Sequence, residues 1–341
     1  AQSPKTDPVP IEDALIAARY PNGLPYYQHW VTIDGIARLN ERSVGDFAHT
    51  VDLSYPYFLV ALAWDGRAER ALAHASRFGP YQRELLTEPA ADFTKIEAFY
   101  RDNFGAVGVA SENLNQVQYF ADVTKLDTPG VERLLSIHDF APVRSVNVDW
   151  TEAAPTGPES SCSGSVYINA NAQPGIHILT ETGGPSFLHR LSVAPGKEEG
   201  LQAFDRMNRM VRLCNWLELP SDQVDALLVA AIRAEVRGGA DKDAWWISSG
   251  VVHALGLFQT MRERYNCTAA DFAVLVDQLS IYGRGEALSQ FDQVFNRQGG
   301  YREPLRLDNG TFPVTPAPGE VNLTINQLCN GLGIDTQTYQ Y

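Results

Sequence analysis

Cysteine and histidine are both sparse in this sequence. The four cysteines among its 341 residues stand far apart in the chain, at Cys162, Cys214, Cys267 and Cys329. So few separated thiols in so long a chain argue against a disulfide framework, and no pair has zinc-finger spacing. The seven histidines are also scattered, and none forms the i, i+4 pair of a helical zinc site. We therefore expect no metal site and no cofactor.

Long apolar runs and basic residues are also in short supply. No stretch of about 20 apolar residues occurs, so no segment is predicted to span a bilayer. The opening residues, AQSPKTDPVP, have neither the basic start nor the apolar stretch of a signal peptide, and no initiator Met is present. The formal charge of -14 argues against binding to nucleic acid or to anionic lipid headgroups. With 44% hydrophobic residues, the chain is nevertheless expected to fold.

Sequence motifs for catalysis are missing as well. No Gly-Lys-Ser/Thr phosphate loop and no GxGxxG after a strand occurs, and Gly183-Gly184-Pro185-Ser186 lacks the closing glycine of a nucleophile elbow. His138-Asp139 is the only adjacent His–carboxylate pair, for which we expect a surface or capping role. Cys162 and Ser163 lie in a loop rich in Pro, Gly and Ser, with His177 or His189 as conceivable partners in space. We predict no catalytic residue. An enzyme using Cys162 or Ser163 is kept as a hypothesis that ranks below the structural and binding roles described below.

A helix–cap–helix pattern is what the sequence does contain. In Phe204–Ala230, apolar residues at helical spacing stop at Leu219-Pro220-Ser221-Asp222 and restart at Val224. Pro fits the first turn of a helix, and Ser or Asp can bind the free N–H groups there. Helices joined by so short a link form αα-hairpins, which bury a core when stacked. The pattern recurs, with a last copy that is cut short, at 251–278, 114–135, 33–51 and 323–341.

A small β element is predicted between the helical blocks. Val143–Trp150 has alternating valines, and Ser165–Glu181 has two strand-like runs around a predicted hairpin turn at Asn171–Gly175. A further turn is expected at Ile281–Gly285. The predicted fold is mainly α, with stacked helical hairpins (a solenoid-like α-helical shell) and a small β insertion. The expected domains are a helical block with an extended N-terminal segment, a β-containing insertion and a second block of hairpins truncated at its C-terminal end, over 1–137, 138–200 and 201–341.

Several segments, taken in order, resemble a known protein family. They are the turn YPNGLPYY at Tyr20–Tyr27, the strand-like Ser165–Thr180, the phrase Ile281-Tyr282-Gly283 with FDQVFN at Phe291–Asn296, and the helix of Phe204–Leu228 with its three arginines, Arg206, Arg209 and Arg212. In this order they resemble the A subunit of bacterial insecticidal toxin complexes (Tc toxins), in the region shared with the Salmonella virulence-plasmid A protein. The resemblance runs over nearly the whole chain.

The resemblance implies a structural role in a secreted toxin made without a visible signal peptide. The family's A subunit is a homopentameric translocator whose α-helical shell surrounds a channel, and pH-driven opening of the shell lets the channel enter a host membrane. This chain would be a fragment of the shell, not an enzyme, and its partners would be the rest of its subunit and the neighbouring A subunits. We hypothesise that His138, His177 and His189 contribute to pH sensing. The alternative is a receptor- or glycan-binding module that uses the β insertion or the face of Trp245-Trp246.

Overall fold

Helices dominate the computed structural model, which confirms the mainly α prediction. The structure describes residues 10–51, 76–148, 164–170, 175–181, 188–241, 245–297, 303–307 and 323–341. The helices and 3-10 turns of the first half are α1 (Ile11–Ala17), α2 (Gln28–Leu39), α3 (Val44–Val51), α5 (Pro80–Thr87), η2 (Phe93–Lys95), α6 (Ile96–Phe104), α7 (Val109–Glu112), η3 (Asn113–Asn115), α8 (Val117–Thr124), α9 (Thr128–Leu135) and η4 (His138–Phe140). Those of the second half are α10 (Glu198–Leu217), α11 (Ser221–Arg237), α12 (Ser249–Tyr265), α13 (Ala269–Val276), α14 (Gln290–Phe295), α15 (Leu323–Leu332) and α16 (Thr336–Gln340).

A helix, a short link and a second helix are present at all five predicted places, and the links share one backbone geometry. α12 and α13 pack mainly against α11 rather than against each other. The pairs are α2–α3, α8–α9, α10–α11, α12–α13 and α15–α16. In each link one residue has a φ between 53° and 65°, and two residues separate it from the start of the next helix. These residues are Glu41, Lys125, Glu218, Asn266 and Gly333. A left-handed residue at this place ends a helix by turning the chain so that the next N–H groups bind its last carbonyls. Leu126 N and Leu219 N do so, binding Ala121 O at 3.0 Å and Cys214 O at 3.2 Å.

Side-chain caps begin most of the second helices. Thr268 Oγ1 accepts from Asp271 N at 3.1 Å and Thr268 N donates to Asp271 Oδ2 at 3.0 Å, so the two residues form a capping box. The prediction at α11 was wrong. Pro220 is the N-cap residue and makes no side-chain bond. Asp222 does not cap either, because its carboxylate faces Arg133, whose Nε lies 3.3 Å away.

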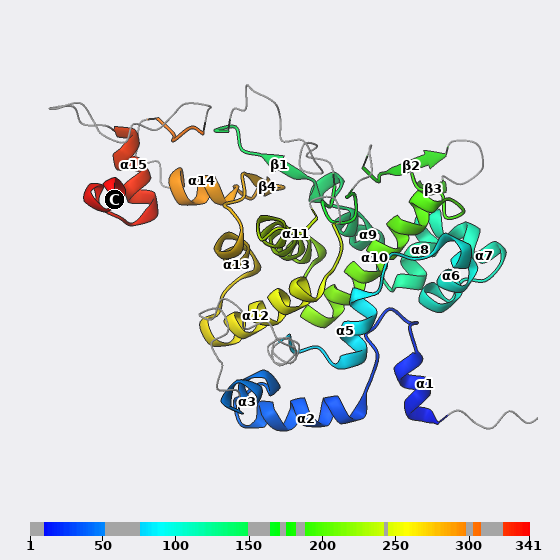
Figure 1. Cartoon of the computed structure of the whole chain (residues 1–341). Helices are drawn as coiled ribbons and strands as arrows, with labels where there is room; N and C mark the ends of the chain where they lie inside the picture. Colours follow the sequence, from blue (N-terminus) through cyan, green and yellow to red (C-terminus); the bar gives the residue numbers. More distant parts are fainter. Residues whose placement is uncertain are drawn as a thin grey trace, which may run out of the picture.

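Helix α10 is the centre of the fold. Every residue from Ala203 to Leu213 is buried, so the helix is enclosed on all sides. Figure 1 shows it running through the middle of the molecule beside α9 and α11. On its apolar side, the Phe204 ring contacts Tyr100 and Phe104 of α6 and Phe120 of α8, with ring centroids 5.9 to 6.1 Å apart. The predicted apolar stripe is therefore real, but the opposite, polar side of α10 is buried too.

The strands form two separate antiparallel pairs, which corrects two predictions. Ser165–Ala170 is a series of turns rather than a strand, because the carboxylate of Asp225 accepts from the N–H groups of Val166 and Tyr167 at 3.0 and 2.9 Å and bends the chain. Strand β2 (Ile178–Glu181) pairs instead with the later β3 (Leu188–Leu191), with Ile178 opposite Leu191. The turn predicted around 171–175 lies mostly outside the described residues.

The second strand pair joins distant parts of the chain. β1 (Pro142–Arg144) pairs with β4 (Tyr282–Arg284), with Val143 opposite Gly283. The turn predicted at 281–285 is therefore a strand, and the strand predicted over 143–150 is short. Cβ of any other residue at Gly283 would stand 2.0 Å from Ala287 O, so the close turn after β4 requires glycine. Among the described residues, every helix is too short or too polar to span a lipid bilayer.

Candidate functional site: the arginine cluster of α10

Three arginines three residues apart line the polar side of α10. Arg206 and Arg209 are 5% exposed and Arg212 is 1% exposed. Burying a guanidinium is costly unless its N–H groups are hydrogen-bonded, so the acceptors that surround these side chains define what the cluster does. Asp205 and Asn208 lie on the same side of the helix and are buried with them. We call these five residues the arginine cluster.

Arg209 binds the end of α5. Its Nε donates to Asp205 Oδ1 at 2.8 Å, and its two terminal nitrogens donate to backbone oxygens of Leu85, Leu86 and Pro89. The last carbonyls of a helix have no partner within it, and here the guanidinium supplies one. The second oxygen of Asp205 accepts from Ala91 N at 2.9 Å. The Asp205–Arg209 pair thus fixes the chain from 85 to 91 against α10.

Arg212 binds the turn at 19–23. Its terminal nitrogens donate to the backbone oxygens of Arg19 and Gly23 and to Asn103 Oδ1, and its Nε donates to Asn208 Oδ1 at 2.6 Å. Burial, together with the nearby Arg19 and Arg209 charges, lowers the pKa of Arg212 to about 10. The guanidinium is still charged at neutral pH, and it is held by neutral oxygens rather than by a carboxylate.

Two asparagines of α10 also bind the 19–23 turn. Asn208 Nδ2 donates to Asn22 Oδ1 at 2.8 Å, and Asn215 Nδ2 donates to Asn22 O at 2.9 Å. Asn22 in turn donates to Val123 O of α8 at 3.2 Å. The segment that carried part of the family resemblance, YPNGLPYY, is therefore fixed to both α10 and α8 by directed hydrogen bonds.

Arg206 lies between two aromatic rings. Its guanidinium carbon is 5.4 Å from the ring centre of Tyr167 and 5.0 Å from that of Trp246, distances typical of cation–π contacts. The Arg209 guanidinium lies 4.4 Å from the same Trp246 ring, and Trp246 Nε1 donates to Glu88 O at 2.7 Å. Trp246 therefore covers the arginine cluster, and its ring face is engaged by two arginines of its own chain. Trp245 is buried, and the two tryptophans precede α12, which begins at Ser249.

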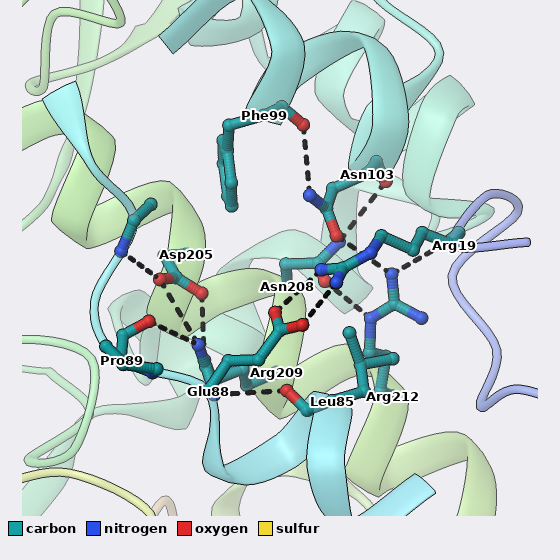
Figure 2. A pocket seen from close by; sticks show the side chains of 11 residues that line it. Arg19, Leu85, Glu88, Pro89, Phe99, Asn103, Asp205, Asn208, Arg209 and Arg212 are labelled. Atoms are coloured by element: carbon teal, nitrogen blue, oxygen red, sulfur yellow. Dashed lines mark hydrogen bonds and ion pairs between the residues drawn. The ribbon is translucent and has the colours of Figure 1, made fainter. Parts of the chain in front are cut away.

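The cavity at the arginine cluster is small. Figure 2 shows Arg19, Glu88, Asn103 and Arg212 facing one another across it, with Arg19 Nη1 donating to Glu88 Oε2 at 2.7 Å. Its volume is about 40 Å³, whereas pockets for small molecules usually measure roughly 300 to 1,000 Å³. The space suits a few water molecules. The arrangement is suited to joining three chain segments to α10, and it has no room for an organic substrate.

A second polar cluster surrounds Asp292 of α14. The Asp292 carboxylate accepts from Asn147 Nδ2 at 2.8 Å, from Asn296 Nδ2 at 2.9 Å and from Ser289 Oγ at 2.8 Å. Burial alone would raise the pKa of Asp292, but these bonds and one from Ser145 outweigh it and hold the pKa below its ordinary value. Asp292 and Asn296 come from the FDQVFN phrase, so this phrase also serves to join distant segments.

The histidines singled out from the sequence do not come together. His138 is exposed, with its Nδ1 3.0 Å from Glu132 Oε1, in line with the predicted surface role. His177 and His189 are exposed on the β2–β3 hairpin, where His189 Nδ1 lies 3.2 Å from Thr180 Oγ1. Cys162 and Ser163 lie outside the described residues. Within the described ranges, no group of His, Cys, Asp and Glu could hold a metal ion.

Comparison with known proteins agrees with the resemblance seen in the sequence. Residues 1–127 match the family described as the Salmonella virulence plasmid 28.1kDa A protein. The chain is also 31% identical over 256 residues to the toxin subunit YenA1 of Yersinia entomophaga. This match covers 72% of the chain and 21% of the relative, so the chain spans about a fifth of that protein's length. Over these regions the chain is similar to the Salmonella virulence-plasmid A protein family and to a Tc toxin A-type subunit.

Proposed function

We propose that this chain is a fragment of the α-helical shell of a Tc-type toxin A subunit. It would be a structural part of a pore-forming translocator, secreted and assembled as a homopentamer, that delivers a protein toxin into host cells. The observation that carries the proposal is the arginine cluster. Arg209 and Arg212 direct their N–H groups to backbone carbonyls and to side chains of the chain itself, which fixes distant segments to α10 as expected of a scaffold.

The direction of these hydrogen bonds supports a scaffold role for α10 more than a binding role. A recognition site keeps some polar groups free to meet a ligand, whereas these are already engaged within the chain. The aromatic pair proposed as a sugar-stacking face is engaged in the same way, because Trp246 contacts Arg206 and Arg209. Both features favour internal support over recognition at α10. The partners proposed for the chain are other parts of its own subunit and neighbouring A subunits.

Binding to host cells tests the proposal against its alternative. The 341-residue chain, fluorescently labelled, would be incubated with insect cells and with a glycan array, and its mass would be measured by light scattering. A scaffold fragment is expected to show no saturable binding in either assay. Saturable binding that is reduced by substitutions on the β2–β3 hairpin, such as Leu179→Ser and His189→Ala, would contradict it and assign the chain to receptor recognition. The matched control is Val107→Ser, an exposed apolar residue far from that hairpin in sequence.

A further inference from the structure

The cavity at the arginine cluster has one positive charge in excess. Three guanidinium groups and two carboxylates line it, those of Arg19, Arg209 and Arg212 and those of Glu88 and Asp205. Each carboxylate already has its own arginine, because Arg209 Nε lies 2.8 Å from Asp205 Oδ1 and Arg19 Nη1 donates to Glu88 Oε2 at 2.7 Å. Within the described part of the chain, the Arg212 guanidinium donates only to neutral oxygens. Its charge is therefore the one without a counter-charge.

The chain has no means of removing this excess charge. Arg212 is 1% exposed, so bulk water does not solvate it. An arginine side chain also keeps its proton at neutral pH, even when burial lowers its pKa to about 10 as it does here. Carbonyl and amide oxygens stabilise the charge without neutralising it, and a buried charge that is not paired is costly. A counter-ion beside Arg212 would lower that cost.

The cavity lining has N–H groups left over for such a counter-ion. A guanidinium has five N–H groups, and the four bonds of Arg212 leave one of those on Nη1 without an acceptor in the described chain. Asn103 Nδ2 donates one of its two hydrogens, to Phe99 O at 3.0 Å. Arg19 binds Glu88 through its two terminal nitrogens, which leaves its Nε. Figure 2 shows these three side chains around the same cavity.

The size of the cavity selects the kind of anion. Its volume is about 40 Å³, which is room for a few water molecules or for a halide ion, only slightly larger than water. An organic acid or a phosphate ester would not fit. The Arg19 and Glu88 side chains are 33% and 32% exposed, so this pair lies on the side from which an ion can enter.

We propose that the cavity binds one chloride ion, with Arg212 as its main partner and Asn103 and Arg19 as further donors. The ion neutralises the excess charge where the 19–23 turn, α6 and α10 meet. Glu88 limits the affinity, because its carboxylate lines the same cavity and repels an anion. The inference does not depend on the proposed function, since it concerns only the charge, the donors and the size of the cavity.

Line broadening of the chloride NMR signal, measured with the whole chain in sodium gluconate buffer, tests the site. Chloride that exchanges with a bound state broadens the signal, and the excess broadening is expected to disappear as added chloride saturates the site. Glu88→Gln removes the repelling carboxylate and should lower the dissociation constant for chloride at least about fivefold. Glu84→Gln makes the same charge change at an exposed residue of α5, so it is the matched control and should leave the constant unchanged.

Crystals of the whole chain grown in sodium bromide locate the ion without any variant. The expected result is an anomalous bromide peak inside the cavity, beside Arg212. A cavity without that peak, or equal dissociation constants for Glu88→Gln and Glu84→Gln, would overturn the proposal and mean that water alone fills the space. Arg212→Met should abolish the saturable broadening; if that variant does not fold, the bromide peak and the Glu88→Gln titration still decide the question.

Discussion

Replacing Arg212 by methionine is the sharpest test of the arginine cluster. Methionine has a similar length and no charge, so Arg212→Met removes the hydrogen bonds while keeping most of the buried volume. Four oxygens lose their donor, belonging to the backbones of Arg19 and Gly23 and to the side chains of Asn103 and Asn208. The change therefore acts on the junction of the 19–23 turn, α6 and α10.

The expected cost follows from those four acceptors. A buried acceptor without a donor costs about 1 to 3 kcal/mol, but water entering the adjacent cavity can satisfy some of them. Removing the buried guanidinium also relieves its desolvation penalty. We expect Arg212→Met to lower the free energy of unfolding by about 3 to 5 kcal/mol, which is the cost of the acceptors that water does not satisfy less the desolvation that is relieved.

Urea unfolding followed by far-ultraviolet circular dichroism measures this difference. The control is Arg101→Met on α6, where the arginine side chain is 58% exposed and pairs with its neighbour Asp102. An exposed pair of this kind contributes little to stability, because solvent screens it. If Arg212→Met lies within about 1 kcal/mol of the wild type, the hydrogen bonds of Arg212 do not hold the fold together and the reasoning fails.

Three further predictions concern other parts of the chain. Asp292→Asn should destabilise the protein by about 1 to 3 kcal/mol at neutral pH. Because the pKa of Asp292 is lowered in the fold, the stability that its carboxylate contributes is present above about pH 4 and is lost as the pH falls through the folded pKa. The urea midpoints of the wild type and the variant should therefore converge at acid pH. Thr268→Ala should cost about 1 kcal/mol in the same assay through loss of the α13 capping box, and no change would contradict the capping role. Gly256→Ala should lower the melting temperature, because the new Cβ would stand 2.3 Å from Ser76 Cα. Gly35→Ala in α2, where a Cβ would meet nothing within 4 Å, should instead raise stability by roughly 0.5 to 1 kcal/mol. Equal effects of the two changes would refute the packing argument.

The helical hairpins were predictable because their signals are local. An apolar stripe, a left-handed residue such as Asn266 and a cap such as Thr268 stand within a few residues of one another. Pro220 misled the prediction because its missing N–H suits both the N-cap and the first turn. Each of these features concerns a single link and can be decided without knowing the rest of the fold.

The strand pairs and the arginine cluster depend on residues far apart in the chain. β1 pairs with β4, and Arg212 binds the backbone at Arg19 and Gly23, which no local pattern indicates. The three-residue spacing of Arg206, Arg209 and Arg212 was visible in the sequence, but a row of arginines beside an apolar stripe usually reads as a solvated face. The signal that could have indicated a buried cluster instead of a solvated face is the presence of Asp205 and Asn208 beside the arginines, because short polar residues suit a buried hydrogen-bond network.

The measurement that tests the central claim most directly is the assembly of a full-length A subunit carrying this region. Native mass spectrometry would compare the assembled fraction of Arg212→Met with that of the exposed control Arg101→Met, and cell binding would be measured on both. The account predicts that Arg212→Met lowers the assembled fraction while Arg101→Met assembles as the wild type does. Normal assembly of Arg212→Met with loss of cell binding alone would contradict the scaffold and show that this region serves recognition.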